Sequence, residues 1–349
     1  MLKNDLYLSA SRIKTLKSCS WLYWCQYVLK IDGGSNDGAS RGTVCHLVFE
    51  TLGEKKHKKE YNKIIKKNDV FASDLVKDII LSEAKKLKVD DEDNLELIKD
   101  MTLKGLKYDF YGTDLDKPTK IFSELDFDLS KDDDEFRYRI LGFIDKLYLY
   151  KSKDTAIIRD FKSSKSMFVG DEISDNIQDW MYALAVKEKF PEYKDRFSEF
   201  LFLKFMDNKQ TKLSIDDVAD GVIKMESIDD SALKGFEHEL TECYSYVEDF
   251  DEEKAVSNLA ANKPFPTDNT FSGKLKCGFA KYKGQLKKDG SLMWHCPFRF
   301  DFKYYKIFDK DKNFIKGIHE DNFNPEELED GFTYEKAQYE GCPAWRNSA

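Results

Sequence analysis

The feature that most constrains the fold of this chain is a change in the spacing of its apolar residues near residue 120. Before this point apolar residues recur at steps of three and four, which is the period of an amphipathic helix. From Lys120 onward they alternate with polar residues, as in a half-buried strand. Turns at residues 131–135 and 151–154 divide this region, and turns this short join antiparallel strands. The pattern predicts an antiparallel meander over residues 120–162, preceded by a helical region.

More elements are predicted after the meander. A helix over residues 174–190 precedes an almost wholly apolar run at residues 200–203, and a strand that is apolar on both faces lies inside a sheet. Helical spacing returns over residues 227–262, whereas the chain beyond Pro264 shows no regular period. We therefore expect an α/β fold with an N-terminal helical lobe and an irregular C-terminal appendage.

No stretch of the sequence has the composition of a linker, so we expect one integrated domain made of three parts. The helical part covers residues 1–115, the core covers residues 116–262, and the appendage covers residues 263–349. The appendage contains a basic segment and an acidic tail. Residues 263–316 hold 13 Lys and Arg against 5 Asp and Glu, and residues 317–349 hold 2 against 8.

The basic segment has two interpretations. It interleaves lysines with the aromatic residues Phe279, Tyr282, Trp294, Phe298 and Phe300, a composition that suits the stacking and steering of a nucleic-acid strand. A lysine-rich solvated face over the core produces the same pattern. The net charge of −9 for the whole chain does not decide between them, because the charge is unevenly distributed.

Two predicted strands carry polar residues in a suggestive arrangement. The first contains Gly142-Phe143-Ile144-Asp145, and the next contains Asp160 and Lys162, whose side chains share one face. If the strands pair, Asp145 approaches Asp160, and two close carboxylates are commonly held by a hard divalent cation. Mg²⁺ keeps several waters, one of which is a candidate nucleophile, and a lysine beside it can stabilise charge on a phosphoryl oxygen. On charge patterning alone, the alternative to a metal site is that these residues are solvent-facing charges on a hairpin at the edge of the sheet.

Four motifs follow one another in an order that is similar to that of a known family. They are the stretch Cys19-Ser20-Trp21-Leu22-Tyr23-Trp24, the segment Arg41-Gly42-Thr43-Val44-Cys45-His46, the strands with Asp145 and with Asp160-Phe161-Lys162, and the helical pair Gln178 and Tyr182. In this order they resemble the RecB-like branch of the PD-(D/E)XK nucleases. This branch includes the nuclease domains of bacterial helicase–nucleases and CRISPR-associated exonucleases. The likeness covers about residues 6–206.

The resemblance implies a restriction-endonuclease-like mixed sheet flanked by helices, and it assigns roles to single residues. It implies that Mg²⁺ or Mn²⁺ is held by His46, Asp145, Asp160 and the backbone carbonyl of Phe161. It implies that Lys162 is the catalytic lysine, which acts together with the two aspartates. The third motif carries Asp160 where the wider superfamily often has glutamate, a variant known within this branch.

Other residues near these motifs have two alternative roles each. Gln178 and Tyr182 lie one helical turn apart, and the resemblance implies that they orient Lys162 or contact the substrate strand. Tyr182 can also be a core residue. Arg41 is a candidate phosphate contact or a surface residue, and Glu124 either supports the metal ligands or is an ordinary strand carboxylate.

The seven cysteines are the hardest residues to interpret. Members of the resembled family often carry an iron–sulfur cluster, which makes Cys19, Cys277, Cys296 and Cys342 candidate ligands. Cys25 and His295 are alternatives for the fourth position. No Cys-x-x-Cys pair is present, so the spacing departs from the family pattern. A cluster, a zinc ion and reduced buried thiols all remain open.

Together these features predict a Mg²⁺- or Mn²⁺-dependent DNA nuclease, a phosphodiester hydrolase. The resemblance favours an exonuclease acting on single-stranded DNA or duplex ends in DNA repair, recombination or replication. The alternative is a catalytically silent or partner-activated DNA-binding subunit. No Gly-x-x-x-x-Gly-Lys-Ser/Thr phosphate loop is present, so a helicase or recombination partner is expected to be a separate protein. We expect a cytoplasmic protein without a membrane partner, because the N-terminus lacks the apolar stretch of a signal peptide.

Overall fold

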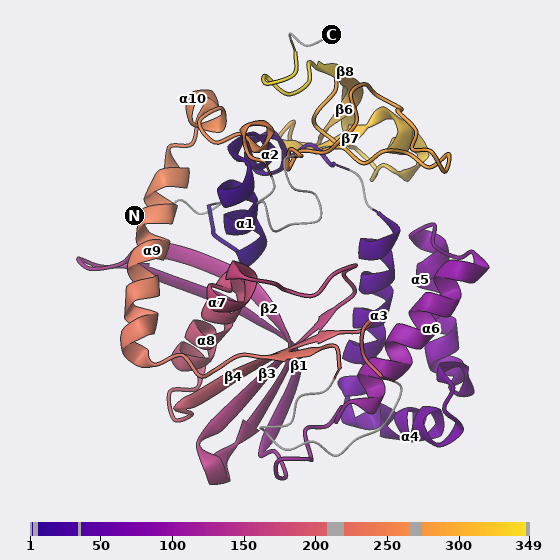
Figure 1. The fold of residues 1–349 in the computed structure, drawn as a ribbon, viewed down its shortest axis with the longest axis vertical. Coiled ribbons are helices and arrows are strands. Elements are labelled where there is room, and N and C mark those ends of the chain that lie inside the picture. Colours follow the sequence, from indigo (N-terminus) through magenta and orange to yellow (C-terminus); the bar gives the residue numbers. More distant parts are fainter. Residues whose placement is uncertain (1, 3–5, 34–35, 208–219, 265–273, 347–349) are drawn as a thin grey trace. The chain divides into compact units, whose positions relative to one another are not determined.

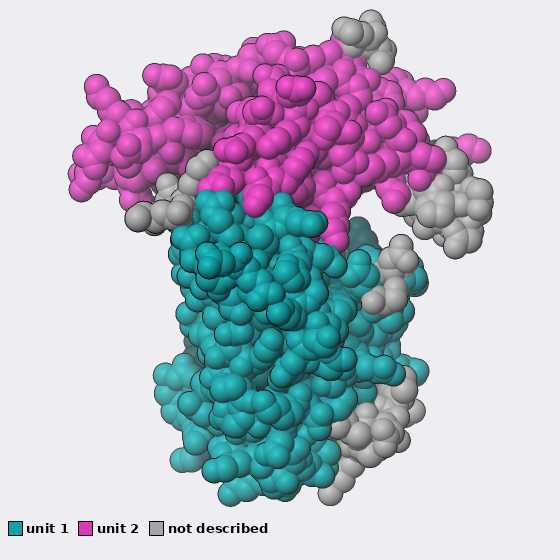
Figure 2. Space-filling view, turned by 90° about the vertical axis from the view of Figure 1, so that its left-hand side faces the viewer, with its two compact units in different colours: residues 1–10, 35–244 teal, residues 11–34, 245–349 magenta. Residues whose placement is uncertain are grey.

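The computed structural model describes the chain except for residues 1, 3–5, 34–35, 208–219, 265–273 and 347–349. The chain forms two compact units, coloured separately in Figure 2. The larger unit comprises residues 1–10 and 35–244, and the smaller unit comprises residues 11–34 and 245–349. The boundaries predicted for the three parts of the chain stay a prediction.

The larger unit is built on a mixed sheet whose strand order is β1-β2-β3-β4-β5. Its strands are β1 (Lys120–Asp132), β2 (Arg137–Tyr150), β3 (Thr155–Lys162), β4 (Asp195–Phe202) and β5 (Val222–Lys224). β3 and β4 pair in parallel, and the other neighbouring strands pair antiparallel. The predicted meander and the interior position of the apolar fourth strand are confirmed.

Helices cover both faces of this sheet (Figure 1). On one face lie α3 (Asp37–Gly53), α4 (Lys58–Lys67), α5 (Asp74–Lys86) and α6 (Glu92–Lys107), and on the other lie α7 (Asp171–Ser174), α8 (Ile177–Lys189) and α9 (Asp230–Glu248). The core under the first layer joins Val48 and Phe49 of α3 to Phe161 and Leu201 of the sheet. The predicted α/β fold with helices flanking a mixed sheet is confirmed.

Helix α3 approaches the sheet closely because two of its residues have no side chain. A Cβ atom at Gly42 would lie 2.5 Å from Ser163 Oγ, and one at Gly53 would lie 2.0 Å from Ser123 Oγ. Real Cβ atoms do not approach this closely, so any larger residue would push the helix outward. The close approach brings His46, which lies between these two glycines, within reach of the strands.

The smaller unit contains elements from both ends of the chain. Its helices are α1 (Ala10–Ser18, whose first residue belongs to the larger unit), α2 (Ser20–Tyr23), a π-helical turn (Trp24–Val28) and α10 (Glu252–Ala255). Its sheet has the order β7-β6-β8, with β6 (Phe302–Phe308), β7 (Phe314–His319) and β8 (Thr333–Tyr339). The predicted irregular appendage therefore contains a regular antiparallel sheet. Lysines interrupt each of its short strands, which hides the period from the sequence.

Two more findings complete the fold. The long helix expected over residues 227–262 is shorter, because α9 ends at Glu248 and α10 begins at Glu252. Among the helices that the structure describes, none is long and apolar enough to cross a membrane.

A buried ion pair fixes β3 to β4 beside the candidate site. Arg159 Nε and Nη2 donate to Glu199 Oε2 at 3.0 and 2.9 Å, and Arg159 is only 3% exposed. Its Nη1 also donates to the carbonyl oxygens of Tyr108 and Asp109. Removing one partner of such a pair leaves the other charge buried without compensation.

We predict that Glu199→Gln lowers the free energy of unfolding by about 3 kcal/mol or more, because the Arg159 charge stays buried. Urea unfolding followed by circular dichroism measures the change. Glu96→Gln is the matched control, since Glu96 pairs with Lys99 at the surface and is 67% exposed. Equal stability of the two variants would contradict the structural role of the buried pair.

Candidate active site

Glu124 of β1 has an unusual backbone conformation beside the candidate site. The pairing of β1 with β2 passes from Ser123 opposite Lys146 to Leu125 opposite Ile144 with no change of register, which places Glu124 across from Asp145. The φ of Glu124, +48°, lies in the left-handed region, which residues other than glycine seldom adopt. Strained backbone of this kind gathers at functional sites.

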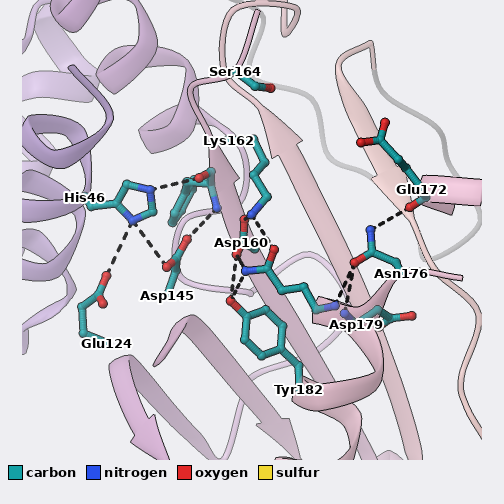
Figure 3. A network of polar contacts seen from close by, with 12 residues as sticks. His46, Glu124, Asp145, Asp160, Lys162, Ser164, Glu172, Asn176, Asp179 and Tyr182 are labelled. Carbon is teal, nitrogen blue, oxygen red and sulfur yellow. Dashed lines mark hydrogen bonds and ion pairs between the residues drawn. The ribbon is translucent and has the colours of Figure 1, made fainter. Parts of the chain in front are cut away.

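His46 of α3 and Asp145 of β2 complete a group with Glu124. His46 Nδ1 is 3.8 Å from Glu124 Oε1 and 3.4 Å from Asp145 Oδ1, and Nε2 is 3.0 Å from the carbonyl oxygen of Phe161 (Figure 3). Ligand atoms of His46, Glu124 and Asp145 all lie within 4.8 Å of one another. Carboxylates are the donors that Mg²⁺ and Mn²⁺ prefer, and an imidazole binds many divalent ions. This donor set therefore fits a divalent metal ion.

Asp145 lies where β2 and β3 stop pairing. The ladder between the two strands ends at the pair Lys146 and Arg159. Beyond it, the backbone N–H of Phe161 donates to Asp145 Oδ2 at 2.7 Å. The Asp145 carboxylate thus accepts a hydrogen bond that a backbone carbonyl would accept in a continuous ladder. This bond fixes the Asp145 side chain at the opening between the strands.

Asp160 of β3 organises the second group of side chains, next to the first. Its Oδ2 accepts hydrogen bonds from Gln178 Nε2 at 2.8 Å and Tyr182 Oη at 2.9 Å, and its Oδ1 is 2.6 Å from Lys162 Nζ. Lys162 Nζ also donates to Gln178 Oε1 at 2.7 Å. Gln178, on the same α8 helix as Tyr182, contacts both the lysine and the tyrosine, because its Nε2 donates to Tyr182 Oη at 2.6 Å. The structure therefore brings Asp160, Lys162, Gln178 and Tyr182 together, and the predicted roles of Asp160 as a metal ligand and of Lys162 as the catalytic lysine stay predictions.

The electrostatics of the two groups show a concentration of negative charge. Burial and the nearby Asp160 carboxylate raise the pKa of Asp145 to about 6. Burial alone would lower the pKa of His46, but Asp145, Glu124 and Asp160 outweigh it and raise that pKa to about 11. Burial, followed by Asp160 and Asp145, raises the pKa of Tyr182 well above its usual value. A cation placed among these groups would relieve the repulsion between the carboxylates.

The group formed by His46, Glu124 and Asp145 is open on one side. A groove of about 470 Å³ is lined by residues that include His46, Glu50, Glu124 and Ser163. A polymer strand can therefore reach the group from outside the larger unit. Arg41 is placed differently, because it is buried and its Nη1 donates to Asn94 Oδ1 on α6. Its predicted contact with substrate stays a prediction.

Four of the predicted cysteine ligands converge in the smaller unit. Cys19, Cys277 and Cys342 are each less than 10% exposed. Burial, together with the thiolates of these three, raises the pKa of Cys296 to about 12. The pKa of Cys342 is raised to about 11 by burial and by Cys19 and Cys277, so these thiols lie close to one another. Cys25 lies beside them and contacts Tyr339 Oη at 3.6 Å.

The thiols are not drawn together as the ligands of a single ion. In the part of the chain that the structure describes, no three cysteine sulfurs lie within 4.8 Å of one another. The predicted cluster or zinc site at these cysteines stays a prediction.

From the sequence, Glu124 was a candidate support for the metal ligands and not itself a donor, and the role of Asn176 was not predicted. Nothing in the sequence marks the left-handed backbone of Glu124. Asn176 caps α8, since its Oδ1 accepts hydrogen bonds from the backbone N–H groups of Gln178 and Asp179. This signal was available, because asparagine directly before a helical pattern is a common N-cap.

Known proteins are similar to this chain to different extents. A family model described as PD-(D/E)XK nuclease superfamily matches residues 7–281. A crystal structure of a protein from Eubacterium rectale, provisionally named an exonuclease, is similar with 12% sequence identity and a TM-score of 0.42, over 70% of this chain and 82% of that one. A crystal structure of SSO0001 is similar with 12% identity and a TM-score of 0.25, over 49% and 70% of the two chains. A search of curated proteins gave no match.

We predict that Glu124→Gln weakens the binding of Mn²⁺ by about 10-fold or more, because it removes one of the charged donors. Isothermal titration calorimetry of the full chain measures the affinity without any need for activity. Glu50→Gln is the matched control, since Glu50 lines the same groove outside the three-residue group. Unchanged binding in Glu124→Gln would show that Glu124 is not a metal donor.

Proposed function

The chain belongs to the PD-(D/E)XK nuclease superfamily, and from this premise we propose that it hydrolyses phosphodiester bonds of DNA with a divalent metal ion. One observation carries the proposal: a set of metal donors lies beside an oriented lysine. His46, Glu124 and Asp145 offer the donors. Asp160 raises the pKa of Asp145 and holds Lys162 at 2.6 Å. This combination suits the metal-assisted hydrolysis of a phosphodiester, since the metal activates water and the lysine stabilises charge on the phosphate.

The protein's own groups have distinct parts in this proposal. A bound divalent ion would supply a Lewis acid for a phosphoryl oxygen and favour deprotonation of water. Asp160 and Gln178 hold Lys162 Nζ, so its charge can stabilise negative charge that develops on the phosphate. Tyr182 positions Gln178 and Asp160, since its hydroxyl accepts from the amide at 2.6 Å and donates to the carboxylate at 2.9 Å.

We further propose that the protein is an exonuclease of the RecB-like branch, acting on single-stranded DNA or duplex ends in repair, recombination or replication. The histidine motif that precedes the strands supports this placement, as does the contact of Gln178 and Tyr182 with Asp160. Any unwinding of duplex DNA would come from a separate helicase.

The alternative is a nuclease-like subunit that binds DNA without cutting it, or cuts only with a partner. The site favours cutting, because the predicted lysine, glutamine and tyrosine all contact Asp160 and the metal donors converge next to it.

We also propose that Cys19, Cys277, Cys296 and Cys342 hold an iron–sulfur cluster rather than zinc. Cys19, Cys277 and Cys342 all influence the pKa of Cys296, so the four thiols lie near one another. The resemblance to the RecB-like branch, whose members often carry such a cluster, favours iron–sulfur over zinc. Cys25 is the alternative fourth ligand, because Cys19, Cys296 and Cys342 influence its pKa, but its thiol contacts Tyr339 Oη at 3.6 Å.

We predict that the purified protein degrades end-labelled DNA with Mg²⁺ or Mn²⁺, and that Lys162→Ala lowers the rate by about 100-fold or more, because it removes charge stabilisation of the transition state. A cleavage time course on single- and double-stranded DNA measures this, and the label gives the polarity. Lys153→Ala is the matched control, as Lys153 lies in the turn before the opposite end of β3.

The outcomes separate the two functions. Metal-dependent cleavage that survives in Lys153→Ala and collapses in Lys162→Ala supports the nuclease. Retained DNA binding with no cleavage under any metal would favour the non-cutting subunit.

We predict that protein purified without oxygen contains iron, and that Cys296→Ser loses it and unfolds at a lower temperature, because a metal that binds only the folded chain stabilises it. Metal analysis and visible absorption measure the cluster. Cys243→Ser in α9 is the control, because Cys243 lies outside the four-cysteine group. Zinc in place of iron, or equal metal content in both variants, would refute the assignment.

A further inference from the structure

Residues 278–295 of the smaller unit form a hairpin, which we call the aromatic hairpin. Backbone N–H groups of Phe279, Lys287 and Met293 donate across it to Trp294, Ser291 and Gln285 at 3.1, 2.7 and 2.8 Å. Its tip turns at Gly290, whose φ of +81° suits a residue without a side chain. The turn is supported by Asp289 Oδ1, which accepts from the backbone N–H of Ser291 at 2.9 Å.

The aromatic hairpin exposes unusually large apolar side chains. Tyr282, Leu286, Leu292 and Trp294 are 63%, 56%, 68% and 57% exposed. A soluble protein seldom gathers this much exposed apolar surface in one short segment without a partner for it. Among the described residues, neither Tyr282 nor Trp294 packs on another aromatic ring. Of the aromatic residues predicted to face a strand, Phe298 is excluded, because it is 1% exposed and belongs to the core.

The charge of the aromatic hairpin indicates what kind of partner it takes. It carries the exposed lysines 281, 283, 287 and 288 against the single acid Asp289. Exposed aromatic rings beside lysines are the means by which proteins bind single-stranded nucleic acid, because rings stack on bases while ammonium groups contact phosphates. In duplex DNA the bases already stack on one another, so the free faces of Tyr282 and Trp294 suit a single strand.

A pocket of about 270 Å³ lies at the base of the aromatic hairpin, where Lys283 and His295 form part of its lining. Three more rings line it, those of Phe300, Phe302 and His319. Pockets for drug-sized molecules measure ~300–1,000 Å³, so this one suits a single flat ring system.

The polar groups of the pocket select a base over a phosphate. Asp32, Asp301 and Asp321 belong to its lining, and carboxylates repel phosphate but accept hydrogen bonds from the exocyclic amino groups of bases. A metal ion does not explain these residues, because no group of three ligand atoms converges here within 4.8 Å in the described part of the chain.

We propose that the aromatic hairpin and its pocket form a binding site for single-stranded DNA. Tyr282 and Trp294 stack on bases, Lys287 and Lys288 contact phosphates, and the pocket takes one unstacked base that carries an amino group. The inference rests on the proposed DNA nuclease function for its ligand, and it adds a strand-holding site separate from the metal donors.

The first test measures binding of the full chain to a fluorescent single-stranded oligonucleotide by anisotropy, in EDTA so that no cleavage occurs. Tyr282→Ala combined with Trp294→Ala is expected to raise the Kd by about 25-fold or more, at the lower end of the ~1–3 kcal/mol per stacked base. Tyr282→Phe combined with Trp294→Phe should retain most of the affinity, because it keeps both rings. Circular dichroism checks that each variant is folded.

The matched control is Leu286→Ala combined with Leu292→Ala on the same hairpin, for which we expect less than about two-fold change because leucine does not stack on bases. An equal loss in the leucine and aromatic variants would overturn the proposal and indicate an apolar docking surface for a protein. Unchanged affinity in the aromatic variant would also overturn it.

A second measurement follows the salt dependence. Lys287→Gln combined with Lys288→Gln should reduce the slope of log Kd against log salt by about 0.7 for each lost phosphate contact. Lys310→Gln, at the β6–β7 turn, should leave the slope unchanged. An unaltered slope in the double variant would show that these two lysines do not contact phosphates.

Base preference tests the pocket. Oligo(dC) should bind about five-fold or more tightly than oligo(dT), and Asp301→Ala should abolish the difference, because thymine has no exocyclic amino group. Equal binding of the two oligonucleotides would overturn the assignment of the pocket.

Since all these assays are made without cleavage, an inactive protein that shows the expected binding would contradict the nuclease function alone. An active nuclease with unchanged binding in every variant would contradict the hairpin alone.

Discussion

The geometry of the active site depends on one hydrogen bond, from the backbone N–H of Phe161 to Asp145 Oδ2 at 2.7 Å. Beyond the pair Lys146 and Arg159 the strands β2 and β3 no longer form a ladder. An unpaired backbone N–H inside the protein would be costly, and the carboxylate satisfies it. The same bond fixes Asp145 next to Asp160, so the opening of the sheet and the meeting of the two carboxylates have one cause.

The left-handed backbone at Glu124 has a complementary effect from the other side of β2. It costs backbone strain, because a glutamate holds a φ of +48°. Glu124 lies across from Asp145 in the register of β1 and β2, and its carboxylate is 3.8 Å from His46 Nδ1. Helix α3 supplies His46 from outside the sheet, and the glycines at 42 and 53 allow the helix to lie close enough. Three separate elements thus converge on one small volume.

Features of the fold and the site that depend on neighbouring residues could be predicted from the sequence, whereas features that depend on residues far apart in the chain could not. The bounds of β3 were predicted correctly because alternation and the flanking turn are local signals, and the shared face of Asp160 and Lys162 follows from the same rule. The spacing of Gln178 and Tyr182, which lie one helical turn apart, is an equally local signal. The left-handed backbone at Glu124 could not be predicted, since the sequence carries no signal for it at a residue other than glycine. Nor does the sequence show that Cys19 meets Cys342, because only the tertiary fold brings the two ends of the chain together.

The charge distribution is consistent with an acidic protein that acts on a polyanion, as proposed. The proposed catalytic groups of the larger unit are dominated by carboxylates, which is reflected in the raised pKa values of His46 and Asp145. Such a site would repel phosphate until a divalent cation changed the sign of its field. The aromatic hairpin, by contrast, carries lysines and exposed rings that would need no metal to bind a strand. Under the two proposals together, strand binding by the smaller unit and metal-dependent cleavage by the larger unit would be set by different residues.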